Sequence, residues 1–254
     1  MPKIDAVQFK AMKFFLGVGK FTPHDMVEGD MGWTSGKVRR VVNMLRFWNR
    51  VLKHGQERLP KSAMEQEVSK KQKWSTFLLE KLGQIDKKEW INGRTAADLN
   101  LVKTGLMGKY EEDWKARVLN KPKLRQYKKW KCKFETEKYV YLNLPRAHRS
   151  RLAQIRGGVL PLRVETGRYH RLELEKRVCE VCQSGDVETE EHFLLYCSVY
   201  EKERETFMLN LSPVNWGQDP ASLIKLLYEV YPRRLGRYVD LLWHKRYELV
   251  HVVA

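Results

Sequence analysis

Residues 179–197 read CEVCQSGDVETEEHFLLYC and decide what kind of fold the C-terminal half of the chain can build. Cys179 and Cys182 are separated by two residues, His192 follows Cys182 by ten positions, and Cys197 follows His192 by five. A cysteine pair with this gap lets two thiolates from one tight turn reach a single tetrahedral ion. Soft thiolates with one imidazole favour zinc, and four such ligands leave no position for a catalytic water. The spacing therefore predicts a structural zinc site.

The segment 190–197, which carries the last two ligands, has a helical pattern. Residues five apart on an α-helix point about 140° away from each other, so we expect either His192 or Cys197 near a fraying helix end. Two alternatives stay open at this point. In the first alternative, the cysteines are core thiols without a metal and His192 is a hydrogen-bonded helix histidine. In the second, His170 takes the place of His192 as a ligand. Cys132 lies far from the cluster in sequence, and we expect it to be a free thiol.

Apolar residues recur at helical spacing through most of the remaining sequence. The clearest case begins after Ser35, a suitable N-cap, and runs to Gly55, a suitable stop. Residues 20–33 contain Pro23, Gly29 and Gly32, which predicts an irregular segment there. We expect helices at residues 10–18, 35–55, 60–85, 95–106, 107–119, 143–157, 221–231 and 235–250. The predicted fold class is mostly α, with a helical N-terminal part and a small C-terminal zinc-stabilised module.

Two apolar patterns are missing from this sequence. No stretch approaches the ~20 apolar residues that a membrane span needs. The apolar run at residues 14–18 is too short for the core of a signal peptide. We therefore expect no membrane partner and an intracellular protein. Within the cell, we expect the nucleus rather than the cytoplasm. Thiols stay reduced inside cells, which again favours a metal site over a disulfide framework.

The chain is strongly basic, with 48 Lys and Arg against 31 Asp and Glu and a formal net charge of +17. Much of this excess lies in residues 117–171, which hold 16 Lys and Arg but three acids, with Tyr, Trp and Phe interleaved. Cations that bind phosphate and rings that stack on bases are the two components of a nucleic-acid surface. The alternative is a solvated basic face over a core built from the same aromatic residues.

One helix of this segment can be drawn in detail, because Asn143 is a suitable cap and Gly157 a suitable end. On its helical wheel, Arg146, Arg149 and Arg156 fall together beside the apolar face. A row of arginines pointing outward from that face can follow a phosphate backbone. We expect phosphate contacts first from Arg146, Arg149, Arg156 and Arg168, and second from Lys128, Lys129 and Trp130.

Several runs of residues match a known family. They are KPKLR at 121–125, LPRAHRS at 144–150, GVLPLRVETGR at 158–168, the pair Cys179 and Cys182, and ETEEHFLLYCSVY at 188–200. The stretch from Lys121 to Arg204 thereby resembles the C-terminal zinc-binding (CCHC) region of reverse transcriptases of non-LTR, LINE-like retrotransposons. Upstream, FLGV at 15–18, GDMGW at 29–33 and RFWNR at 46–50 resemble the thumb region that follows the polymerase palm. The resemblance implies a region that contacts RNA or DNA and holds template and target during reverse transcription.

The resemblance does not imply polymerase activity for this chain. A polymerase palm needs closely placed aspartates for two metal ions, and the nearest match, YVDL at 238–241, has one aspartate. We therefore expect no enzyme but a zinc-containing nucleic-acid-binding protein. Two alternatives are a zinc-stapled module that binds an acidic protein and an accessory part of a reverse transcriptase whose palm is on another chain. The expected parts are a helical thumb-like region at 1–116, a basic aromatic segment at 117–171, a CCHC zinc module at 172–210 and C-terminal helices at 211–254.

Overall fold

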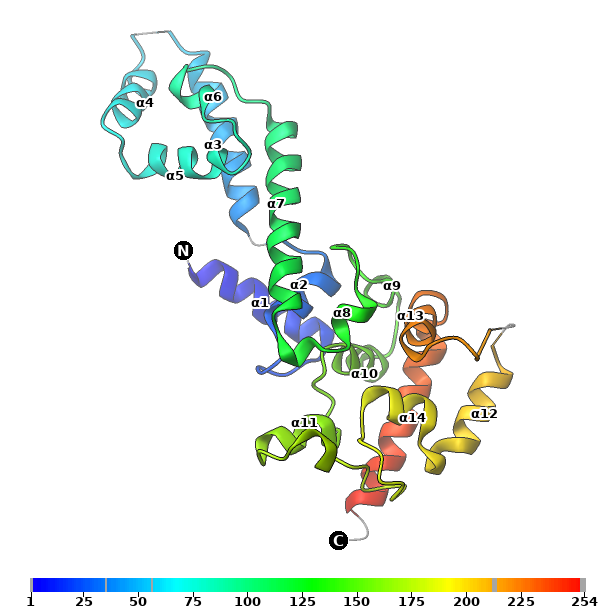
Figure 1. Cartoon of the computed structure of the whole chain (residues 1–254). Coiled ribbons are helices and arrows are strands. Elements are labelled where there is room, and N and C mark those ends of the chain that lie inside the picture. The colour runs from blue at the N-terminus through cyan, green and yellow to red at the C-terminus, as the bar shows by residue number, and fades with distance from the viewer. Residues whose placement is uncertain (1, 35, 56, 212–213, 252–254) are drawn as a thin grey trace. The chain divides into compact units, whose positions relative to one another are not determined.

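A computed structural model of the chain describes residues 2–34, 36–55, 57–211 and 214–251 (Figure 1). The predicted mostly α fold is confirmed, since helices make up nearly all of the regular structure in these ranges. Ser35, the expected N-cap, lies outside the described residues. The chain divides into two compact units: unit 1 comprises Met1–Asp5 with Thr34–Ala116, and unit 2 comprises Ala6–Trp33 with Arg117–Ala254.

This division differs from the expected four parts. The boundary after residue 116 coincides with the expected one, but residues 6–33 belong with the C-terminal unit rather than with 34–116. The three parts expected from residue 117 onward form one compact unit. The reason is that residues 6–33 pack against the basic segment, as described below.

Unit 1 is a cluster of helices around an apolar core. Its elements are α3 (Gly36–Leu52), α4 (Leu59–Ser69), α5 (Lys73–Gly83), α6 (Glu89–Asn92) and most of α7 (Leu99–Leu119). Helix α3 contributes Val41, Leu45 and Trp48 to the core at helical spacing. The Trp48 indole donates to the carbonyl of Thr95 at 2.9 Å, which satisfies its polar atom inside the core.

Two helix boundaries in unit 1 differ from the sequence expectation. The single helix expected at 60–85 is two helices, because Lys71 between α4 and α5 has a left-handed backbone (φ 47°). The two helices expected at 95–106 and 107–119 are the single helix α7. Gly105 does not end that helix; a Cβ there would lie 2.9 Å from Ile85 Cγ2, so the glycine lets Ile85 pack close to α7.

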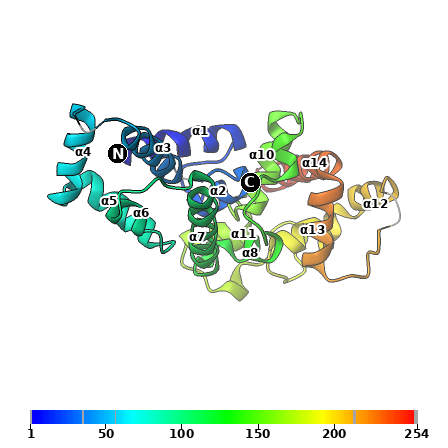
Figure 2. The same ribbon diagram turned by 90° about the horizontal axis from the view of Figure 1, so that it is seen from above.

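Unit 2 contains the remaining elements. They are α1 (Pro2–Leu16), whose residues from Ala6 belong here, α2 (His24–Met31), η1 (Pro122–Leu124), α8 (Tyr127–Trp130), α9 (Lys138–Tyr141), α10 (Arg146–Arg156), α11 (Arg163–Tyr169), η2 (Leu174–Lys176), the π-helix η3 (His192–Tyr196), η4 (Ser198–Tyr200), α12 (Glu201–Leu209), α13 (Pro220–Val230) and α14 (Pro232–His251). Helix α10 packs along α14, as Figures 1 and 2 both show. Gly236 of α14 permits this approach, because a Cβ there would lie 3.0 Å from His148 Cβ.

The segment expected to be irregular at 20–33 contains helix α2. Pro23 precedes its first turn and Gly32 ends it in a left-handed conformation (φ 61°), with the Gly32 N–H donating to Glu28. Proline before a helix and glycine after it are boundary signals, so these residues mark the ends of a short helix rather than a loop. No helix of the described ranges is long and apolar enough to cross a membrane.

Helix α10 ends in a buried polar cluster. The carboxylate of Asp30, which has no exposed surface, accepts hydrogen bonds from Arg156 at 2.8 and 3.0 Å. It also accepts from the hydroxyls of Tyr127 (3.0 Å) and Tyr139 (2.6 Å). Glu137 pairs with Arg156 at 2.9 Å and completes the cluster. This one carboxylate therefore joins α2, α8, α9 and α10.

Candidate metal centre and basic surface

The four predicted ligands come together in unit 2. One ligand atom from each of Cys179, Cys182, His192 and Cys197 lies within 4.8 Å of the others. The Cys182 sulfur lies 3.4 Å from His192 Nε2, and Cys179, His192 and Cys197 are buried. The histidine of the group is His192 and not His170, whereas the free thiol of Cys132 is exposed and stands apart. Three thiolates and one imidazole in this arrangement can hold one metal ion, and zinc is compatible with them.

A short hairpin presents the first two ligands. Val178 and Val187 form an antiparallel bridge, and the Cys179 N–H donates to the Asp186 carbonyl at 2.8 Å. Between them the chain turns through left-handed backbone at Gln183 (φ 55°) and Gly185 (φ 84°). The tight turn brings both thiols of the pair to the same side, as the two-residue gap predicts.

A π turn presents the other two ligands. Residues His192–Tyr196 form the π-helix η3, and the Cys197 N–H donates to the His192 carbonyl at 2.8 Å. An i→i+5 hydrogen bond places residues five apart one turn from each other, whereas an α-helix would point them about 140° apart. Cys197 is the first residue after this helix, which agrees with the expectation that one ligand lies at a helix end.

Hydrogen bonds among the ligands change their proton affinities. Contact with the Cys197 thiol, helped by His192, lowers the pKa of Cys179 to about 3. The same contact raises the pKa of Cys197, because a thiol that donates to a thiolate holds its proton more tightly. The hydrogen bond with Cys179 also raises the pKa of His192. A metal ion bound here has to displace these protons, so its affinity falls as the pH falls.

Buried carboxylates anchor the metal module to the rest of unit 2. Glu188 accepts from Arg246 of α14 at 2.6 and 2.8 Å and from the backbone N–H of Arg163 at 2.6 Å. Two residues further on, Glu190 accepts from Arg125 at 2.7 Å. Sequence reasoning missed both, because an acidic run reads as exposed surface. Their alternation at 188 and 190, directly before an apolar helical stretch, is the one signal that marks them.

The basic segment is largely neutralised within the protein. Ten of its 16 Lys and Arg form ion pairs with carboxylates. Several of these carboxylates lie far away in sequence, such as Asp25 with Arg117 and Asp240 with Arg151. The cations without a carboxylate partner within the described part of the chain are Lys128, Lys133, Lys138, Arg146, Arg149 and Arg171.

Two of the predicted contact residues are buried, and the prediction that they reach phosphate is wrong. Arg156 is 2% exposed and bonds to Asp30, while Trp130 stacks on Tyr228 with ring centroids 6.0 Å apart. The helical wheel placed Arg156 at its correct angle beside the apolar stripe. Neighbouring elements cover both faces of the last turn of α10, and the buried carboxylate of Asp30 compensates the charge.

The other predicted contact residues are at the surface but differ in their partners. Arg168 is exposed and pairs with Glu165 at 3.0 Å, and Lys129 pairs with Glu191 at 3.3 Å. Lys128 is exposed without such a pair. Arg146 and Arg149 lie on the exposed side of α10, and their guanidinium carbons lie over the rings of residues 14 and 15.

These rings belong to the C-terminal turn of α1, which docks on α10. Gly17 ends α1 in the left-handed conformation, and the Arg149 guanidinium donates to the Phe15 carbonyl at 2.9 Å. A cation at this position also compensates the partial negative charge of a helix C-terminus. We define the arginine–phenylalanine surface as Phe14, Phe15, Arg146 and Arg149. Sequence reasoning missed the phenylalanines, although two adjacent rings before a helix-ending glycine are a readable signal.

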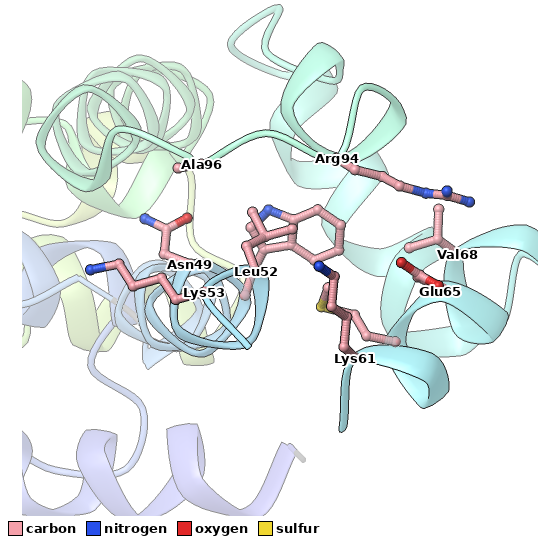
Figure 3. A pocket seen from close by; sticks show the side chains of 10 residues that line it. Asn49, Leu52, Lys53, Lys61, Glu65, Val68, Arg94 and Ala96 are labelled. Atoms are coloured by element: carbon pink, nitrogen blue, oxygen red, sulfur yellow. The ribbon is translucent and has the colours of Figure 1, made fainter. Parts of the chain in front are cut away.

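A separate pocket of about 590 Å³ lies in unit 1. Figure 3 shows Asn49 and Leu52 reaching it from α3, Lys61 and Glu65 from α4, and Arg94 from the segment after α6. Its full lining is Trp48, Asn49, Leu52, Lys53, Lys61, Met64, Glu65, Val68, Arg94 and Ala96. This lining offers one carboxylate and no thiol or imidazole, and therefore not the paired carboxylates of a two-metal reaction.

The chain was compared with known proteins. No protein-family model, no curated protein and no solved structure matches it.

Proposed function

We propose that this protein binds nucleic acid through the arginine–phenylalanine surface, and that its CCHC group holds a structural zinc ion. The observation that carries the proposal is that Arg146 and Arg149 are not neutralised. Both are free of carboxylate partners within the described residues, whereas most cations of the same segment are neutralised. Two unpaired guanidinium groups one turn apart on a rigid helix suit contacts with successive phosphates.

Zinc has a supporting role in this proposal. Four ligands complete its coordination, so the ion supplies folding energy rather than an activated water. Through Glu188 and Arg246 the metal module is fixed to α14, and α14 packs on α10. The module therefore supports the helix that carries the two arginines. The resemblance to the zinc-binding region of LINE-like reverse transcriptases favours the same function, and we propose binding without catalysis.

The test is the salt dependence of binding by the full chain. Each phosphate contact contributes about 0.7 to 0.9 to the slope of log affinity against log salt. The variant Arg146→Gln with Arg149→Gln should lower this slope by about 1.4 to 1.8 across unrelated sequences, because phosphate contacts carry no base information. The matched control is Lys70→Gln with Lys103→Gln, which removes two exposed charges from unit 1 and should leave the slope unchanged.

Two results would overturn the proposal. The first is an unchanged slope for the arginine variant with a normal circular dichroism spectrum. The second is equal competition by polyglutamate and by RNA, since the surface would then recognise negative charge and not nucleic acid.

A further inference from the structure

The arginine–phenylalanine surface carries more apolar area than phosphate binding requires. Phe14 is 69% exposed and Phe15 is 37% exposed, whereas Met12 and Leu16 of the same helix are fully buried. Two adjacent aromatic rings left in water forgo the stabilisation that burying their apolar area would give. These rings are therefore poorly explained as packing residues of unit 2.

The rings are held in place by the arginines. The guanidinium carbon of Arg146 lies 4.6 Å from the Phe14 centroid, and that of Arg149 lies 4.3 Å from the Phe15 centroid. In each contact the positive guanidinium group is attracted by the negative face of the ring. The Schellman-type end of α1 fixes the backbone beneath them, with Gly17 N–H donating to Phe14 and Val18 N–H to Lys13. The two aromatic rings are therefore held in a fixed position beside the two guanidinium groups.

A third ring and a third cation continue this arrangement. Phe21 is 73% exposed, and the ammonium of Lys20 lies 4.9 Å from its centroid. The Lys13 ammonium donates to the Lys20 carbonyl at 2.8 Å, so the segment around Phe21 is tied to the last turn of α1. The chain that follows α1 thus carries a further exposed ring with its own cation.

We infer that this surface takes single-stranded nucleic acid, with unpaired bases stacked on Phe14 and Phe15 and with Arg146 and Arg149 on the flanking phosphates. The inference rests on the proposed function and names its substrate class. A duplex hides the faces of its bases, so a ring can stack on them only in a single strand. Phenylalanine has no hydrogen-bonding group, so the stacking tolerates any sequence.

The experiment compares binding of fluorescein-labelled oligo(U), oligo(dT) and matched RNA and DNA duplexes by the full chain. The variant is Phe14→Leu with Phe15→Leu, which keeps apolar volume and both arginines but removes the aromatic faces. Stacking is worth about 1–3 kcal/mol per base, which corresponds to about 5- to 150-fold in affinity. We expect the wild type to prefer single strands and the variant to lose at least about fivefold on them, with little change on duplexes.

The matched control is Phe47→Leu, which removes an exposed ring of α3 that also lies under an arginine, Arg50. It should leave single-strand affinity unchanged. Equal wild-type affinity for single strands and duplexes, or equal losses on both for the phenylalanine variant, would overturn the inference while the proposed function stands. Absence of binding to any nucleic acid, or competition by polyglutamate equal to that by RNA, would overturn the proposed function itself.

Discussion

Substituting Arg156 by Gln should destabilise unit 2 severely. The same substitution at Arg146 or Arg149 should lower its stability only slightly. Removing the guanidinium leaves the carboxylate of Asp30 buried, with Tyr127 and Tyr139 as its remaining donors. Breaking a buried ion pair from one side costs about 3–5 kcal/mol, because the other charge is left uncompensated. Domains have a total unfolding free energy of about 5–15 kcal/mol, so this loss is a large share. Loss of the Arg146 contact with Phe14 should cost about 0.5–1 kcal/mol.

The assay is urea unfolding of the full chain followed by circular dichroism. Hydrogen exchange of amides in α2 and α10 assigns the loss to unit 2, because a chain with two units need not unfold in one step. A double variant, Asp30→Asn with Arg156→Gln, removes both charges and should cost less than the sum of the two single changes. If Arg156→Gln changed the unfolding free energy by less than about 1 kcal/mol, the buried pair of Asp30 and Arg156 would not stabilise unit 2.

Further predictions concern the metal group, the buried tyrosines and nucleotide addition by the chain. Purified protein should contain one zinc per chain by elemental analysis, and the variants Cys179→Ser and Cys197→Ser should lose it. The affinity for zinc should fall toward about pH 5, because protons compete for the ligands. A metal-free chain that is fully folded would contradict this prediction. Burial raises the pKa of Tyr127 and Tyr139 well above their usual value, so the folded state holds both protons more tightly than the unfolded chain. The stability this gives is fully present below about pH 10 and is lost as the pH rises further, which urea midpoints across that range can measure; an unchanged midpoint above it would speak against the cluster. With magnesium and a primed template, the chain alone should add no nucleotide, and template-dependent extension in a primer assay would show that a catalytic site had been overlooked.

The sequence predicted the residues that meet locally. The group of Cys179, Cys182, His192 and Cys197 follows from spacing alone, because each pair lies within one turn or one short helix. Helix α10 ends at the predicted pair Gly157 and Gly158, and Gly158 has the left-handed backbone (φ 59°) that glycine favours. The identity of the metal and the binding of nucleic acid stay predictions.

What the sequence did not predict depends on partners that are distant in the chain. Periodicity gives the angle of Arg156 on its helix, but Asp30, which lies 126 residues earlier, determines that this side chain is buried. In the same way, the charge of the basic segment is cancelled by acids such as Asp25 and Glu190 that pattern analysis treats as separate surface. The π turn at His192 was missed because α and π turns have the same local apolar pattern.

In the proposed complex with nucleic acid, the Asp30 cluster affects how the binding free energy is divided between the partners. By joining α2, α8, α9 and α10 through one carboxylate, it removes backbone freedom from α10 before any ligand arrives. The outer side of that helix carries Arg146 and Arg149, so these side chains start from a fixed frame. Under the proposed function, a flexible nucleic acid then supplies nearly all of the ordering, and the stiffness of that nucleic acid mainly sets the entropic cost of association.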